Sequence, residues 1–308
     1  MMMVLFQRKI IYMGYIPPGS RTEILDDGDP DMRGLVKEDV AIESQNGVTL
    51  RGYLFKRRQT TISAQTPRKA IVVYFQGNVG SPIHRLPLFR KLLTHPLLDA
   101  QHPTTLEILA VPPRSFGRST NQPPTQRGIL RDYTAVTQYA SHQAKTTDAA
   151  VIWMGHSLGA SVATVLLDHE PPNTRCDALI FENGFASIPE MVRALYPSKW
   201  VPYHYLGRLA LDIWDARGVF ERGALGKVPV LFVSSDDDEL VPPAMMHGLY
   251  EAARSRDASG EGGRLSRGVT WVGVKGGLHD FAWKKEAWGK SVVRFVKDVA
   301  DTRKEEHG

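Results

Sequence analysis

The stretch that decides the fold is Ala149-Ala150-Val151-Ile152-Trp153-Met154-Gly155-His156-Ser157-Leu158-Gly159, in which an apolar run leads into a serine flanked by glycines. The apolar part predicts a buried strand, and the small residues Ala160 and Ala163 fall in a predicted helix that follows. A Gly-x-Ser-x-Gly sequence between a strand and a helix is typical of a strained turn that exposes a nucleophilic serine. The pattern therefore predicts Ser157 as a nucleophile, against the alternatives of a purely structural turn or a protein that has lost its activity.

Similar apolar runs recur along the chain and alternate with segments of helical spacing. The strand-like runs are residues 70–75, 106–111, 149–154, 178–181, 228–234 and 269–274, and the helix-like segments are 83–93, 128–142, 158–167, 243–254 and 284–299. This alternation predicts an α/β fold, a mostly parallel central sheet with helices on both faces. Residues 39–56 add two antiparallel strands, because Asn46-Gly47 suits a tight hairpin turn.

One segment interrupts the alternation. Residues 183–225 are rich in aromatic residues and proline, and we expect them to form a small cap or lid insertion. Residues 1–38 are an N-terminal segment, for which packing on the domain and a membrane-proximal arm are the alternatives, and the native N-terminus could be longer. No internal repeat and no linker divides the chain, so residues 1–308 are predicted to form a single domain.

Composition excludes several classes of protein. The chain has 308 residues and a formal charge of +5, with lysine and arginine scattered rather than clustered, so we expect no nucleic-acid partner. Peripheral contact with an anionic membrane remains open. Because Cys176 is the single cysteine and the sequence has no Asn-x-Ser/Thr acceptor, we expect a cytoplasmic location, or association with the cytoplasmic side of a membrane if an anchor precedes this sequence.

A serine nucleophile needs a histidine to accept its proton. His279 follows the last strand-like run and precedes the final helix-like segment, which is where we expect the base. His204 and His247 are alternatives, and His156 inside the serine motif is expected to pack or to support the site.

The histidine in turn needs an acid. Asp236-Asp237-Asp238-Glu239 follows the run 228–234, and residue type alone does not choose among these four carboxylates. Glu182, at the end of the run before it, is a further alternative.

The reaction also needs backbone N–H groups that stabilise an oxyanion. We expect these from Leu158, directly after the nucleophile, and from Asn78 in the glycine-containing turn at 76–80. A phosphate-binding role for that turn is disfavoured, because it lacks the Gly-x-Gly-x-x-Gly spacing and a P-loop lysine. No metal and no organic cofactor is expected.

Three stretches resemble one known family in the same order: Tyr74-Phe75-Gln76-Gly77-Asn78, Glu182-Asn183-Gly184-Phe185-Ala186-Ser187-Ile188 and Tyr196-Pro197-Ser198-Lys199-Trp200. They are similar to motifs of the bud-emergence-type α/β-hydrolase domain-containing serine hydrolases, over roughly residues 8–300. The resemblance implies the α/β-hydrolase fold, and it implies that the acid is Asp238, which begins Asp-x-x-Val-Pro-Pro, and that the base is His279. Two positions depart from the family pattern, Gln76 and the turn at 113–117, and both are expected near the mouth of the site.

These features predict a serine hydrolase that cleaves a carboxylic ester or thioester of an acyl chain through an acyl-enzyme on Ser157. The substrate would be a small-molecule or protein-linked acyl group, and the resemblance implies removal of palmitate from cysteine as one subclass beside lipid ester hydrolysis. A serine peptidase and a non-catalytic interaction protein on the same scaffold remain the alternatives.

Overall fold

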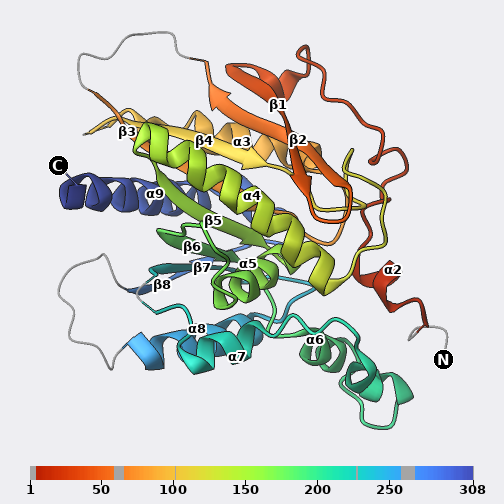
Figure 1. The fold of residues 1–308 in the computed structure, drawn as a ribbon. Coiled ribbons are helices and arrows are strands. Elements are labelled where there is room, and N and C mark those ends of the chain that lie inside the picture. The colour runs from red at the N-terminus through yellow and green to blue at the C-terminus, as the bar shows by residue number, and fades with distance from the viewer. Residues whose placement is uncertain (1–4, 59–65, 101, 227, 258–267, 308) are drawn as a thin grey trace.

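One eight-stranded sheet runs through the computed structural model, which describes residues 5–58, 66–100, 102–226, 228–257 and 268–307 (Figure 1). The strands are β1 (Leu35–Ser44), β2 (Val48–Arg57), β3 (Arg68–Phe75), β4 (Thr104–Ala110), β5 (Ala150–His156), β6 (Ala178–Glu182), β7 (Val230–Ser235) and β8 (Val269–Val274). Their order in the sheet is β1-β2-β4-β3-β5-β6-β7-β8. β2 pairs antiparallel with β1 and with β4, and all other pairs are parallel. The predicted α/β fold with a mostly parallel sheet is confirmed.

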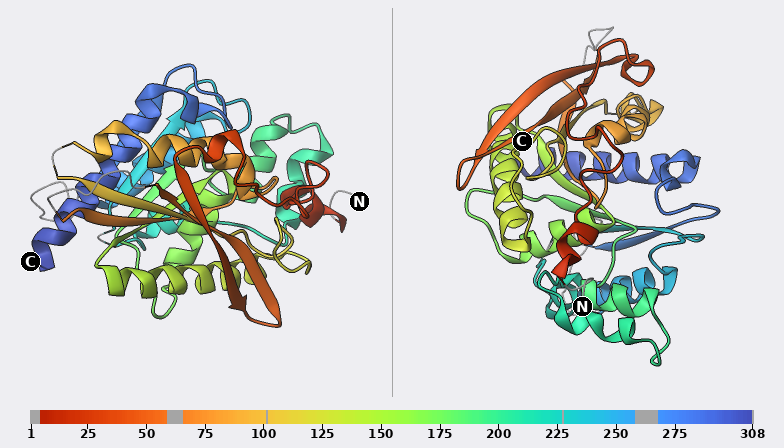
Figure 2. Two further views of the ribbon diagram at one scale, coloured as in Figure 1. Left: turned by 90° about the horizontal axis from the view of Figure 1, so that it is seen from above. Right: turned by 90° about the vertical axis from the view of Figure 1, so that its right-hand side faces the viewer.

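Helices cover both faces of this sheet (Figures 1 and 2). The α-helices are α2 (Gln7–Ile11), α3 (Leu86–Leu93), α4 (Gln126–Thr147), α5 (Leu158–Asp168), α6 (Ile188–Leu195), α7 (Ala216–Arg222), α8 (Pro243–Asp257) and α9 (Glu286–His307). Short 3-10 helices lie at Pro30–Met32, Pro82–Arg85 (η2), Pro96–Leu98, Pro202–Leu209 (η4) and Ala282–Lys284.

The alternation of side chains along β3 explains why the sheet is covered by a layer of helices on each face. Ile71, Val73 and Phe75 join a buried cluster with α4, α5, α7 and α8, whereas Val72 and Tyr74 join a second cluster with α3 and α9. Successive side chains of a strand point to opposite faces, so a strand buried on both sides is apolar throughout. The central strands are therefore fixed from both sides, and their carboxyl ends form a rigid edge for a site.

The predicted cap segment, residues 183–225, has two parts in the structure. Helix α6 and η4 protrude beside the carboxyl ends of the parallel strands, near the N-terminal helix α2 (Figures 1 and 2). Helix α7 instead packs in the layer of α5 and α8, and its Val219 and Phe220 are buried. The protruding part, α6 and η4, is called the outer cap below.

Candidate active site

Ser157 occupies the tight turn between β5 and α5. Its φ of 55° and ψ of −122° are unusual for a residue with a side chain. A Cβ added to Gly159 would collide with the backbone oxygens of Phe75 and Gln76, and one added to Gly155 would collide with the backbone at Gly159 and Ala160. The glycines of the motif are therefore required for the close approach that holds Ser157 in this conformation.

His279 and Asp238 form a buried hydrogen-bonded pair. His279 Nδ1 lies 2.8 Å from Asp238 Oδ2, and the two side chains are 3% and 2% exposed. The other oxygen, Asp238 Oδ1, accepts the backbone N–H groups of Leu240 at 2.9 Å and Val241 at 2.8 Å. Because three hydrogen bonds fix the carboxylate, it holds the imidazole in one orientation and favours a proton on Nδ1.

The other carboxylates of the 236–239 cluster have different positions. Asp236 and Asp237 are exposed. Glu239 Oε2 accepts the backbone N–H of His279 at 3.0 Å, so it supports the histidine from outside. Of the four candidates that sequence reasoning left open, the structure brings the Asp238 side chain to the ring of His279.

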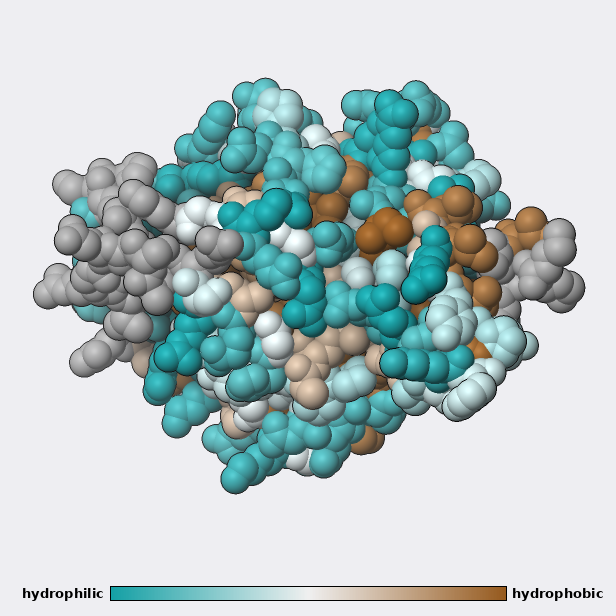
Figure 3. Space-filling model, turned by 90° about the horizontal axis from the view of Figure 1, so that it is seen from below, coloured by the Kyte–Doolittle hydropathy of each residue, from teal (hydrophilic) through white to brown (hydrophobic). Residues whose placement is uncertain are grey.

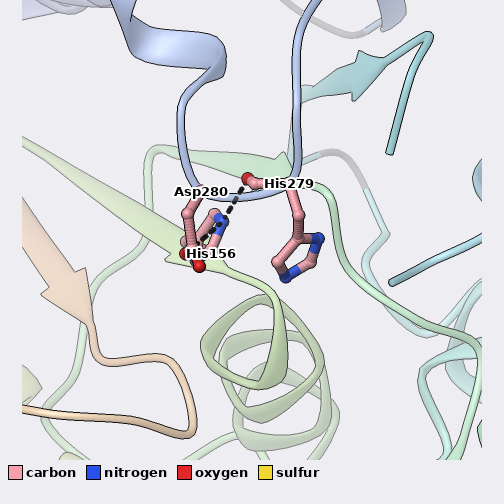
Figure 4. A group of neighbouring side chains, drawn as sticks. All are labelled: His156, His279 and Asp280. Carbon is pink, nitrogen blue, oxygen red and sulfur yellow. Dashed lines mark hydrogen bonds and ion pairs between the residues drawn. The ribbon is translucent and has the colours of Figure 1, made fainter. Parts of the chain in front are cut away.

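The His279 ring lies beside the turn that joins β5 to α5, where Ser157 is located (Figure 4). Within the described residues, neither His279 Nε2 nor Ser157 Oγ makes a hydrogen bond. The hydrogen bond between nucleophile and base is often long in an unliganded site and tightens when substrate binds. The two alternative bases lie elsewhere: His204 Nδ1 bonds the backbone oxygen of Tyr196, and His247 is mostly exposed on α8.

Two buried side chains form hydrogen bonds with the backbone oxygen of His279. His156 Nε2 and Asn183 Nδ2 each lie 2.9 Å from the backbone oxygen of His279. His156 Nδ1 faces the Arg85 guanidinium at 2.9 Å, and because arginine can only donate, the His156 proton is on Nε2. Burial, and then the charge of Arg85, keep the pKa of His156 well below its ordinary value. His156 is therefore a neutral donor that supports the site, as the sequence predicted.

Within the described residues, Glu182, the weaker acid candidate, forms no hydrogen bond with His279. Its Oε1 accepts the indole N–H of Trp288 at 2.6 Å, while its Oε2 is buried and has no hydrogen-bond partner. Burial raises the pKa of this carboxyl to about 7 against the attraction of Arg85. The structure thus places Glu182 in the buried layer below the site.

The turn after β3 lies directly against the start of α5, as the tight packing of Gly159 on Phe75 and Gln76 requires. The Asn78 carbonyl accepts the N–H of Met13 at 2.7 Å. The N–H of Leu158 belongs to the first turn of α5, where backbone donors have no partner inside the helix. Within the described residues the Asn78 N–H makes no hydrogen bond. Both predicted oxyanion donors are therefore available at the same edge of the sheet.

The two departures from the family pattern, Gln76 and the turn at 113–117, are largely buried, and Arg114 within that turn itself agrees with the pattern. Gln76 is buried, its Nε2 donates to the Val79 carbonyl at 2.7 Å, and its Oε1 has no partner. Arg114 is also buried, and its side chain forms two hydrogen bonds with Asp132 on α4, at 2.7 and 2.8 Å, beside one from its backbone N–H at 2.9 Å. Gln76 thus shapes the turn after β3, whereas Arg114 anchors its loop to α4.

His156, His279 and Asp280 lie close enough together to suggest a metal site (Figure 4). Both His156 nitrogens and His279 Nδ1 are already committed, because His156 bonds Arg85 and the His279 backbone, and His279 Nδ1 bonds Asp238. The Asp280 carboxylate is paired with Arg85. The Arg85 guanidinium also repels a cation at this point. These donors fit a hydrogen-bonded support better than they fit a metal ion.

No family model matches this chain, whereas curated proteins and solved structures are similar to it. The α/β-hydrolase domain-containing protein WAV2 of Arabidopsis thaliana is 28% identical over 318 residues, which cover 100% of this chain and 93% of that protein. Protein bem46 of Schizosaccharomyces pombe is 27% identical over 80% of this chain and 74% of its own length. The lysophosphatidylserine lipase ABHD12 of Danio rerio is 30% identical, over 62% of this chain and 49% of its own length.

The solved structure is an esterase of Pyrococcus furiosus. It superposes with a TM-score of 0.64 at 15% identity, covering 90% of this chain and 95% of that esterase. At this identity the likeness concerns the fold.

Proposed function

This chain belongs to the α/β-hydrolase superfamily, and we propose that it is a serine hydrolase that cleaves carboxylic esters or thioesters of acyl chains. The observation that carries the proposal is the buried pair of His279 and Asp238 beside the strained Ser157 turn. A serine in an elbow conformation, next to a histidine oriented by a carboxylate, is the arrangement that activates a hydroxyl for acyl transfer.

The proposed mechanism begins when Ser157 Oγ attacks the acyl carbonyl carbon and His279 Nε2 accepts the hydroxyl proton. Asp238 stabilises the imidazolium that forms, and the N–H groups of Leu158 and Asn78 stabilise the oxyanion. His279 then gives the proton to the leaving alcohol or thiol, and an acyl-enzyme remains on Ser157. Water, deprotonated by His279, attacks this ester and releases the acid, which restores the serine hydroxyl.

The proposed substrate is an acyl chain on a small molecule or on a protein. ABHD12 is named as a lysophosphatidylserine lipase, and the similar solved structure is named as an esterase. These names favour esters of acyl chains, including lipid esters, while a thioester such as palmitoyl-cysteine requires the same triad chemistry with a better leaving group. A serine peptidase and a non-catalytic scaffold are the competing outcomes of the tests below.

We also propose peripheral contact with a membrane, with the protein in the cytoplasm or on the cytoplasmic side of the membrane. Within the described residues, no helix has the length and apolar character needed to cross a bilayer. The outer cap region exposes large apolar side chains, among them Trp200 at 95% and Leu211 at 63%. Arg193 and Lys199 lie in the same segment of sequence, a combination that suits an anionic lipid surface.

A labelling experiment tests the nucleophile. A fluorophosphonate probe should label the wild-type chain and should not label Ser157→Ala, because the probe reacts with an activated serine hydroxyl. Ser161→Ala is the matched control, since Ser161 lies on α5 directly after the Ser157 turn but donates its hydroxyl proton to the Phe185 carbonyl at 2.8 Å. Labelling that persists in Ser157→Ala would contradict the assignment.

A substrate series tests the reaction. Hydrolysis rates for p-nitrophenyl esters of rising chain length, compared with an acyl-thioester and a peptide substrate, separate the candidate activities. Turnover of esters or thioesters that is lost in Ser157→Ala supports the proposal. Turnover of the peptide alone favours a peptidase, and no turnover of any substrate favours the scaffold.

A further inference from the structure

Arg85 is the last residue of η2, the 3-10 helix that follows the turn after β3. This helix begins directly after the turn, where the Ser81 hydroxyl accepts the N–H of Ile83 at 3.3 Å. The Arg85 side chain is only 14% exposed. Because a guanidinium carries donors and no acceptor, its position depends on acceptors that other segments supply.

The first of these segments is the loop that carries His279. Arg85 Nη1 donates to the backbone oxygen of Asp280 at 3.0 Å, and Nη2 donates to Asp280 Oδ1 at 2.5 Å. Asp280 directly follows the proposed base, and the contact joins positions 195 residues apart. A planar guanidinium that binds one residue at two points fixes its direction as well as its distance.

The second segment is the turn that carries the nucleophile. Arg85 Nη2 lies 2.9 Å from Nδ1 of His156, the residue before Ser157. Figure 4 shows His156 and Asp280 side by side at the end of β5, with His279 next to them. One guanidinium therefore binds the neighbour of the nucleophile and the neighbour of the base, and its own chain leads back to the turn after β3.

Lys91 on α3 binds the same loop at a different place. Its Nζ donates to three backbone oxygens, those of Trp283 at 2.7 Å, Lys284 at 3.1 Å and Lys285 at 2.9 Å. Within the described residues, Lys91 forms no hydrogen bond with His156 or Asp280. Lys91 thus anchors the loop farther along the chain from the base, without a contact to the nucleophile turn.

Arg85 is not part of the apolar surface of the molecule. Hydrophobic side chains gather at the end that carries the outer cap (Figure 3). Trp200 and Leu211 are among the exposed apolar residues of that region. The hydrogen bonds of Arg85 within the described residues go instead to the loops of the site. Its loss should therefore change the rate of the reaction more than the binding of an apolar substrate.

We propose that Arg85 is a positioning residue, which holds the nucleophile turn, the loop of the base and the turn after β3 in one arrangement. The inference rests on the proposed function, because it concerns proton transfer from Ser157 to His279. Arg85 acts on this step through the neighbours of both residues. A displacement of about 1 Å between reacting groups lowers a rate by roughly 100-fold.

The activity test compares Arg85→Met and Arg85→Lys with the wild-type chain on p-nitrophenyl acetate. Arg85→Met should lower kcat about 10- to 100-fold and change KM less than about twofold. Arg85→Lys should recover only part of the loss, because an ammonium group lacks the planar fork that binds Asp280 and His156 together. Rates are expressed per active site titrated with fluorophosphonate.

Lys91→Met is the matched control, since it removes hydrogen bonds to the same loop. It should lower Tm and keep kcat within about threefold of the wild-type value. A wild-type kcat in Arg85→Met overturns the proposal. An equal loss of kcat in Lys91→Met also overturns it, because any loosening of the loop would then have the same effect.

A spectroscopic test separates this inference from the proposed reaction. In a chain with ¹⁵N-labelled histidine, Arg85→Met should shift the Nδ1 signal of His156 toward that of an acceptor without a hydrogen bond, and Lys91→Met should not. His156→Leu assigns the signal. If the wild-type chain hydrolyses no ester but the shift occurs, the reaction fails and the link from Arg85 to the nucleophile turn stands. If esters are hydrolysed and neither kcat nor the signal responds to Arg85→Met, the reaction stands and the role of Arg85 is wrong.

Discussion

His156 Nε2 lies 2.9 Å from the backbone oxygen of His279, so the residue before the proposed nucleophile binds the residue proposed as the base. The contact joins chain segments 123 positions apart. Arg85 occupies the other nitrogen of His156 at 2.9 Å and fixes the imidazole as a neutral donor. The positions of nucleophile and base are thus linked through one buried ring.

The first prediction concerns this positioning residue. His156→Leu should lower kcat about 10- to 100-fold with little change in KM for a short ester, because a small displacement of the base disrupts proton transfer. His156→Gln should recover part of the loss, since its amide can still donate to the His279 carbonyl. Rates should be expressed per active site titrated with fluorophosphonate, which removes any effect of misfolded protein. Wild-type kcat in the leucine variant would exclude the positioning role.

The second prediction separates two neighbouring carboxylates. Asp238→Asn should lower kcat by roughly 10³- to 10⁴-fold, because the amide cannot stabilise the imidazolium and favours the wrong tautomer. Glu239→Gln should retain activity within about threefold, because its amide oxygen can still accept the His279 backbone N–H. The measurement is kcat for one ester at the pH optimum of the wild-type chain. Equal effects of the two substitutions would remove Asp238 from its assigned role.

The sequence predicted the sheet well because burial on both faces leaves a local pattern. The run at 70–75 is apolar throughout, and each of its side chains reaches one of the two cores. Helix ends were predicted less well: α4 continues to Thr147 and α9 to His307, beyond the predicted ends at 142 and 299. Their last turns are largely polar, and a polar turn that is stabilised by backbone hydrogen bonds has no apolar period to reveal it.

The predicted cap illustrates a second limit. Aromatic and proline-rich sequence marked all of 183–225 as one insertion, but α7 packs against the sheet layer. The signal was present in Ala216, Val219 and Phe220, whose spacing forms one apolar face of a helix. A short helix carries too little of this periodicity to stand out from its surroundings.

Around the candidate site, the residues that lie in sequence motifs could be predicted. The residues whose partners lie far away in the sequence could not. The choice of Asp238 needed a family resemblance, because four carboxylates in succession carry no information about which one turns inward. Arg85 and Arg8 were given no role, and Asn183 was quoted only as part of a family motif. Arg8 and Asp212 are 204 positions apart, and such a contact leaves no periodic or local pattern in the chain.

The third prediction concerns stability. Asp132 is fully buried and accepts hydrogen bonds from the Ser44 hydroxyl and from the backbone N–H, Nε and Nη2 of Arg114. Asp132→Ala should lower the free energy of unfolding by about 3–5 kcal/mol, because it leaves the Arg114 charge buried and unpaired. Urea unfolding curves measure this difference.

The matched control for that prediction is Asp99→Ala. Asp99 pairs with Arg57 at 2.7 Å, but the two side chains are 62% and 41% exposed. Loss of such a surface pair should change the free energy of unfolding by less than about 1 kcal/mol. Similar losses for the two variants would show that the Arg114–Asp132 pair contributes no more than a surface pair.

The fourth prediction uses the buried carboxyl of Glu182. Burial raises its pKa from 4.5 to about 7. As pH rises, the unfolded chain therefore loses the Glu182 proton at a lower pH than the folded chain does. The stabilisation is therefore fully present below pH 4.5 and is lost as pH rises through about 7, by up to about 3 kcal/mol. Glu182→Gln keeps a neutral side chain that can still accept from Trp288, and it should remove this pH dependence.

The decisive quantity is the difference in Tm between the wild-type chain and Glu182→Gln, measured from pH 5 to pH 8. The wild-type chain should lose stability relative to the variant across this range, because only the wild-type chain acquires a buried negative charge. The nearby Arg85 guanidinium attracts that charge and reduces the loss, which makes 3 kcal/mol an upper figure. Glu43→Gln, at an exposed position on β1, should run parallel to the wild-type chain. If the Tm of Glu182→Gln also changes with pH in parallel with that of the wild-type chain, Glu182 stays ionised in the folded chain. The attraction of Arg85 would then outweigh the effect of burial on its pKa.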